Sequence, residues 1–95
     1  MPYEWLDIAL ARLRGIEPYE VMQALNAKRR LPVPGTSGDV PIVAVCARTN
    51  AGRPLAVAVR LLGGFKQEIV GARDLTPDEL ARFEQWEAGQ DGQDD

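Results

Sequence analysis

A chain of 95 residues with 45% hydrophobic residues has the size and apolar content of one globular domain and is too apolar for a disordered segment. It contains no histidine and a single cysteine, which excludes a His-activated nucleophile, the usual His-bearing zinc sites and an internal disulfide. The net charge of -3 is uneven, because four acids and no bases lie from Glu87 to Asp95. We therefore expect a nearly neutral domain over residues 1–87 and a disordered acidic tail over 88–95.

The sequence also carries no signal for a membrane or for export. Its apolar stretches are far shorter than the ~20 residues that span a bilayer, and the acidic Glu4 and Asp7 do not fit a secretory leader. We expect a cytoplasmic protein without a membrane, metal or cofactor requirement. Any catalysis would have to come from arginine, lysine, carboxylates, tyrosine or backbone groups.

The first third of the chain predicts two helices. Apolar residues at helical spacing favour a helix over 3–13, which Gly15 would end, although Tyr3-Glu4-Trp5 could instead form a short strand. A second helix is expected over 18–26, because Pro18 suits the first helical position and apolar residues follow at helical spacing.

The middle of the chain predicts an antiparallel meander. The basic triplet Lys28-Arg29-Arg30, which suits a helix C-terminus, is followed by a Pro/Gly-rich connector with a short edge strand around 31–33. Turn residues at 50–53 and 63–64 then separate three apolar runs. These runs predict strands over 42–49, 55–62 and 65–72.

A third helix is expected over 77–87. Thr76 can cap it, and Glu79 stands three residues later, where it completes a capping box. An apolar stripe at helical spacing would pack this helix on the sheet: Leu80, Phe83 and Trp86. The expected fold is therefore α+β, with two N-terminal helices, a three- to four-stranded antiparallel meander and a C-terminal helix on the sheet.

Alternation along the strands separates two unlike faces. A three-residue loop at 50–52 would place Ala44 opposite Ala58 and Cys46 opposite Ala56. One face then carries valine and leucine, and the other carries small residues with arginines at its ends, Arg48 and Arg60. Small residues on a sheet face leave room for a helix, a partner chain or a ligand.

The Gly63-Gly64 turn decides on which face Arg73 lies. A two-residue loop puts Arg73 on the face of Arg60, whereas a three-residue register pairs Arg60 with Glu68 and moves Arg73 to the opposite face. Gly-Gly favours the two-residue loop, so we expect both guanidinium groups on one face, where they could hold a phosphate. The alternative is that each arginine forms an ordinary ion pair with a nearby carboxylate, Arg60 with Glu68 and Arg73 with Asp74 or Asp78.

Three motifs occur together in this chain: Glu4-Trp5 near the start, Gly15-Ile16 with Tyr19-Glu20 at a helix start, and Ile69-Val70-Gly71-Ala72-Arg73 at a strand end. Over residues 3–87, this pattern resembles the BrnT-type toxins of the RelE/ParE-like superfamily. The resemblance implies a type II toxin that cleaves RNA, free or on the ribosome, and that a cognate antitoxin protein neutralises.

The resemblance also implies site residues. Arg60 and Arg73 match the strand arginines that are catalytic in the family, and further nucleic-acid contacts would come from Arg14, Arg48 and Lys66. Such a site needs few protein groups, because RNA supplies its own 2′-hydroxyl as the nucleophile. The arginines would stabilise the negative charge that grows on the phosphoryl oxygens.

The chain departs from this family at several points. Leu13 and Arg14 replace a frequent Lys-His pair, Gly71 replaces a serine, and the pI of about 4.9 is acidic rather than basic. Aromatic residues make up only 6% of the chain and are not interleaved with its basic residues, as a stacking platform for bases would require. These departures support a second hypothesis, in which an inactive module of the same fold binds a partner protein through its small-residue sheet face.

Overall fold

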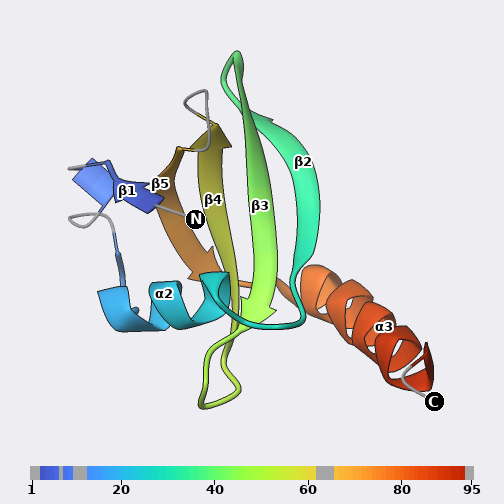
Figure 1. Cartoon of the computed structure of the whole chain (residues 1–95). Helices are drawn as coiled ribbons and strands as arrows, with labels where there is room; N and C mark the ends of the chain where they lie inside the picture. Colours follow the sequence, from blue (N-terminus) through green and yellow to red (C-terminus); the bar gives the residue numbers. More distant parts are fainter. Residues whose placement is uncertain (1–2, 7, 10–12, 62–65, 94–95) are drawn as a thin grey trace.

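The computed structural model describes residues 3–6, 8–9, 13–61 and 66–93 of the chain (Figure 1). A mixed sheet has the spatial order β1-β5-β4-β3-β2, with β1 parallel to β5 and the other pairs antiparallel. Two helices complete the described part, α2 (Pro18–Leu25) and α3 (Pro77–Gln93). The strands are β1 (Tyr3–Trp5), β2 (Leu31–Ser37), β3 (Val40–Arg48), β4 (Pro54–Leu61) and β5 (Gln67–Asp74).

The predicted architecture is wrong at the N-terminus. Tyr3–Trp5 is a strand, and the five-stranded mixed sheet replaces the expected three- to four-stranded meander. The predicted helix over 3–13 is therefore not observed as such: Ile8 and Ala9 are helical, and residues 7 and 10–12 lie outside the described residues. In the described part, α2 is the one N-terminal helix with defined ends.

Pairing with β5 explains why the first residues form a strand. Tyr3 lies opposite Gln67, Trp5 lies opposite Ile69, and the Leu6 N–H donates to the Ile69 carbonyl at 3.1 Å. Hydrogen bonds to β5 satisfy backbone groups that a short isolated segment would leave to water. Periodicity over three residues cannot distinguish a helix from a strand, so this pairing was invisible in the sequence.

β2 is longer than the predicted edge strand and contains two prolines. Pro32 and Pro34 lie opposite Val45 and Val43 of β3. A proline has no N–H to donate, so it fits only where that group would point away from the neighbouring strand. Both prolines therefore remove donors from the free edge of the sheet, which protects this edge from pairing with another strand.

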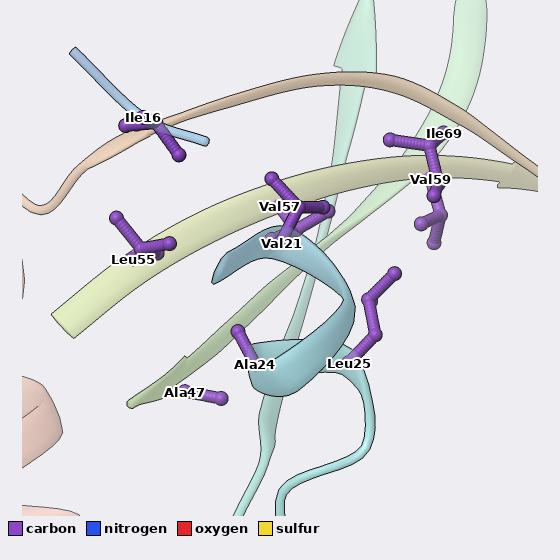
Figure 2. Close-up of a cluster of buried hydrophobic side chains, with 9 residues drawn as sticks. All are labelled: Ile16, Val21, Ala24, Leu25, Ala47, Leu55, Val57, Val59 and Ile69. Carbon is purple, nitrogen blue, oxygen red and sulfur yellow. The ribbon is translucent and has the colours of Figure 1, made fainter. Parts of the chain in front are cut away.

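The main core lies between α2 and the sheet (Figure 2). A capping box begins α2: the Glu17 N–H donates to the Glu20 carboxylate at 3.0 Å, and Pro18 takes the first helical position. We call the sheet face toward α2 the inner face. It packs large side chains of β4 and β5 against one side of the helix: Leu55, Val57, Val59 and Ile69 against Val21, Ala24 and Leu25. Each large side chain buried there contributes about 1.5–3 kcal/mol.

α3 begins as the sequence predicts and extends further. The Glu79 N–H donates to Thr76 Oγ1 at 3.3 Å, and the Thr76 N–H donates to Glu79 Oε1 at 2.9 Å, which completes the predicted capping box. The helix continues to Gln93, past the predicted end at Glu87, and its last turns project away from the sheet (Figure 1). Within the described part of the chain, no helix combines the length and apolar character needed to cross a bilayer.

Candidate binding face of the sheet

The sheet face opposite α2, the outer face, carries small residues. Cross-strand partners share a face, and two rows of partners define this one. One row runs through Leu31, Cys46, Ala56 and Arg73, and the other runs through Val33, Ala44, Ala58 and Gly71. The predicted register of the first hairpin, with Ala44 opposite Ala58 and Cys46 opposite Ala56, is confirmed.

The predicted two-residue loop at Gly63-Gly64 is wrong, because Arg60 pairs with Glu68 and Leu61 pairs with Gln67. This is the alternative register, and residues 62–65 themselves lie outside the described residues. If the pairing of Arg60 with Glu68 continued without interruption along β4 and β5, Arg73 would lie on the inner face.

A β-bulge reverses this outcome. Val59 lies opposite Ile69, whereas Ala58 lies opposite Gly71, so Val70 is an extra residue between the two pairs. The shift returns Arg73 to the outer face, which it shares with Arg60 as predicted, although by a different route. Gly71 is the sequence signal for this bulge, since glycine inside a strand often marks one.

The two predicted catalytic arginines share a face but do not converge. Arg73 lies opposite Ala56, four residues along β4 from Arg60, which corresponds to about 13 Å. Arg60 pairs with Glu68, and Arg73 donates to both carboxylate oxygens of Glu79 at 2.5 and 2.7 Å. Each guanidinium group therefore already has a carboxylate partner within the chain.

The ion pair between Arg73 and Glu79 shifts the pKa of both residues. The hydrogen bond from Arg73, followed by the backbone bond from Thr76, lowers the pKa of Glu79 to about 2. The same side-chain bond raises the pKa of Arg73. Burial, followed by the charge of Glu79, raises the pKa of the Cys46 thiol nearby. At neutral pH these groups are thus an ionised pair and a neutral thiol.

The predicted nucleic-acid contacts fall in three places. Arg48 lies under α3, where it donates to both carboxylate oxygens of Glu87 at 2.9 Å. That bond raises the pKa of Arg48. Lys66 lies at the start of β5, 3.8 Å from Glu4, and Arg14 is exposed in the segment before α2. Arg48 and Arg73 each pair with a glutamate of α3, at the end of the outer face that this helix covers.

An apolar part of the outer face is not covered by α3. Val33 is 44% exposed there, and the neighbouring apolar side chains are half-buried. A shallow hollow of about 330 Å³ lies on this surface, and a Cβ added at Gly71 would meet no atom within 4 Å. We call this surface the outer patch and define it by Val33, Ile42, Ala44, Ala58 and Val70.

The outer patch is apolar between charged residues at its two ends. Arg60 with Glu68 lies at one end, and Arg73, which lines the hollow, lies at the other. Among the described side chains, Arg60 Nε is the one buried polar atom without a hydrogen-bond partner. The described residues also include no group of three or more His, Cys, Asp or Glu side chains that could hold a metal ion.

Sequence reasoning missed Arg53, which organises the end of the sheet near α2. Its guanidinium donates to Asp74 at 2.9 and 3.1 Å and to the Gly15 carbonyl at 2.8 Å, and it lies 3.3 Å from Glu20. The hydrogen bond from Arg53 lowers the pKa of Asp74. Arg53 therefore connects a hairpin turn, the start of α2 and the end of β5. An arginine next to Pro54 in a turn was the available signal.

Comparison with known proteins adds no assignment to this geometry. No protein family and no curated protein matches the sequence. The motifs that resemble BrnT-type toxins lie in β1, in the segment before α2 together with the first turn of α2, and in β5. That resemblance stays a hypothesis, and a function has to be argued from the outer face itself.

Proposed function

We propose that this protein is a binding module for another protein and that the partner docks on the outer patch. One observation carries the proposal: part of the outer face is apolar and uncovered, while the arginines beside it are already paired within the chain. Uncovered apolar surface with a charged boundary is typical of protein–protein contact sites. An anion would first have to displace a carboxylate.

Docking on the face is favoured over pairing at a sheet edge. β2 forms one edge and lacks the donors that Pro32 and Pro34 remove. β1 forms the other edge and is only three residues long. Neither edge offers a partner a long row of free backbone groups, whereas the outer patch offers side chains small enough for close approach.

The chemistry of the outer face also favours binding over catalysis. A general base works best when its pKa lies near the working pH, and the pKa of Glu79 is about 2. The Cys46 thiol is buried with a raised pKa, so it is a poor nucleophile. Arg60 and Arg73 are each paired with a carboxylate of the chain, Glu68 and Glu79, so neither guanidinium group is free to hold a phosphate.

A toxin that cleaves RNA is the second candidate, in line with the resemblance. The observation that favours it is the exposure of the Arg73 side chain, 56%, beside the hollow. An exposed ion pair is weak, so an RNA phosphate could displace Glu79 from Arg73. Both candidates place the protein in the cytoplasm, and in the second one the partner protein is the cognate antitoxin.

Site-specific photocrosslinking in cells tests the proposal. A photoreactive amino acid replaces Val33 on the outer patch, and a matched control replaces Leu61, which is also apolar and is 68% exposed but follows the inner-face register. We expect one protein adduct at position 33, none at position 61, and loss of the adduct when Ala58→Glu is added.

Two results distinguish the binding module from the RNA-cleaving toxin, one from the crosslinking experiment and one from an RNA-cleavage assay. Absence of a protein adduct at position 33, or the same adducts at both positions, would refute the binding module. RNA cleavage by the purified chain that disappears in Arg73→Ala would support the toxin instead.

A further inference from the structure

The end of the outer face next to the outer patch is occupied by α3. Phe83 of α3 is 1% exposed and packs on Cys46 and Ala56, the small residues of β3 and β4. Arg48 and Arg73 stand on either side of these residues. We call this surface the α3 seat and define it by Arg48, Cys46, Ala56 and Arg73.

α3 matches its seat in charge as well as in shape. Glu87 pairs with Arg48 at 2.9 Å, Glu79 pairs with Arg73 at 2.5 Å, and the Arg48 guanidinium lies 5.6 Å from the centre of the Phe83 ring. Glu79, Phe83 and Glu87 follow one another at four-residue spacing, which places them on one side of the helix. The seat is thus complementary to a carboxylate–aromatic–carboxylate stripe.

The attachment of α3 is light for a helix of 17 residues. Phe83 is its one fully enclosed side chain among those described, and the side chains of Arg48 and Arg73 are 34% and 56% exposed. Ion pairs of this exposure are screened by solvent and salt. The last turns of the helix project away from the sheet (Figure 1), so they add little to the contact.

The α3 seat is continuous with the outer patch. Ala56 and Arg73 belong to the seat and also line the hollow of the outer patch. α3 is tethered to its seat and competes at an effective concentration on the order of millimolar. A partner helix can overcome that advantage if it fills the seat and then continues over the apolar surface that α3 leaves uncovered.

We propose that the partner presents an acidic amphipathic helix, with an aromatic residue between two carboxylates at four-residue spacing, and that this helix displaces α3 from its seat. The inference rests on the proposed function, because it names the part of the partner that docks. It follows from charge complementarity, since α3 itself shows which side chains the seat accepts, and from the continuity between the seat and the outer patch.

A peptide with the sequence of residues 75–93 is the probe, and amide NMR of the full-length chain is the readout. The full-length chain carries Glu79→Gln and Glu87→Gln. These substitutions remove the two ion pairs that hold α3 on its seat, while glutamine at position 79 can still complete the capping box. We expect saturable shifts at the amides of Cys46 and Ala56. The control peptide with Phe83→Ala should bind at least about 10-fold more weakly, since it lacks the aromatic anchor.

Two results would overturn the inference. One is the absence of shifts at Cys46 and Ala56 at millimolar peptide, and the other is equal binding of the two peptides. The unmodified chain should bind the first peptide several-fold more weakly than the Gln variant, because its own α3 competes better. A protein adduct at position 33 without peptide binding would refute helix displacement and leave the binding module in place. Peptide binding without an adduct would refute the module.

Discussion

The two faces of the sheet are built from alternate residues of the same strands, yet they differ in packing. The inner face carries large aliphatic side chains that interlock with α2, and Leu55, Val57 and Ile69 are fully buried there. The outer face carries alanine, glycine and cysteine, and α3 covers only part of it. The difference teaches that the inner face supplies most of the core, while the outer face leaves small apolar residues uncovered beyond α3.

The arginines repeat this contrast. Arg53, at the α2 end of the sheet, donates to Asp74, to Glu20 and to the Gly15 carbonyl, so its guanidinium joins three segments. Arg60, on the outer face, pairs with Glu68 and leaves its buried Nε without a partner. A buried donor without an acceptor is unfavourable by about 1–3 kcal/mol. The incomplete pairing therefore lies on the face that we assign to binding.

The largest expected effect comes from the inner face. Leu55→Ala should lower the free energy of unfolding by about 3–4 kcal/mol, because it opens a cavity at a position with 0% exposure. Leu61→Ala on the same strand is the matched control and should change the free energy by less than about 0.5 kcal/mol, since Leu61 is 68% exposed. Urea denaturation measures both. Equal losses in the two variants would contradict the assignment of the core to the inner face.

The next largest effect should come from the aromatic anchor of α3. Phe83→Ala removes the one ring enclosed between α3 and the sheet and should cost about 3 kcal/mol. Trp86 stacks on Phe83 with a centroid distance of 5.7 Å, so its fluorescence should report the release of α3. If Trp86 emission and α3 amide exchange stay unchanged in the variant, α3 is not anchored through Phe83.

A smaller effect should appear as pH dependence. The pKa of Glu79 is lowered to about 2 in the folded chain, so its contribution is present above the ordinary pKa of 4.5 and is lost as the pH falls from 4.5 towards 2. Because the ion pair with Arg73 is partly exposed, we expect only about 1 kcal/mol. Urea denaturation at pH 6 and pH 3 should show a smaller difference in Glu79→Gln than in the unmodified chain. An identical difference would mean that Glu79 is not the titrating group.

The smallest effect should come from the outer patch. Ala58→Glu adds a charge to an uncovered surface and should change the free energy of unfolding by less than about 0.5 kcal/mol. Thermal denaturation at two salt concentrations measures it. A loss above about 2 kcal/mol would show that Ala58 belongs to a closed core and that the outer patch is not free. A small loss also makes this variant the proper blocking mutation for the crosslinking experiment.

Local signals in the sequence were enough for several elements. Pro18 and the apolar spacing after it predicted α2, and the Thr76–Glu79 capping box predicted the start of α3. The turn near Asn50 predicted the register of the first hairpin, which placed Ala44 and Ala58 together. Each of these features depends on residues that are close in sequence, where propensity, capping and turn length act directly.

The candidate site was predictable only in part for the same reason. The small-residue face followed from alternation along β3 and β4, and Arg48, Arg60 and Arg73 do lie on it. Their carboxylate partners were harder to assign. Glu87 stands 39 residues from Arg48 in the chain, and Glu79 was recognised only as part of a helix cap. Which carboxylate meets which guanidinium depends on where α3 comes to rest.

The sequence by itself determined the alternation that separates a large-residue face from a small-residue face, because side chains in a strand point to opposite sides whatever the strand pairs with. Tertiary structure alone decided that Tyr3–Trp5 joins β5 and that the bulge at Val70 keeps Arg73 beside the outer patch. Both outcomes depend on backbone hydrogen bonds between distant segments. Such bonds form only after the chain has folded back on itself, so a local signal such as Gly71 marks where a bulge can form but does not decide the pairing.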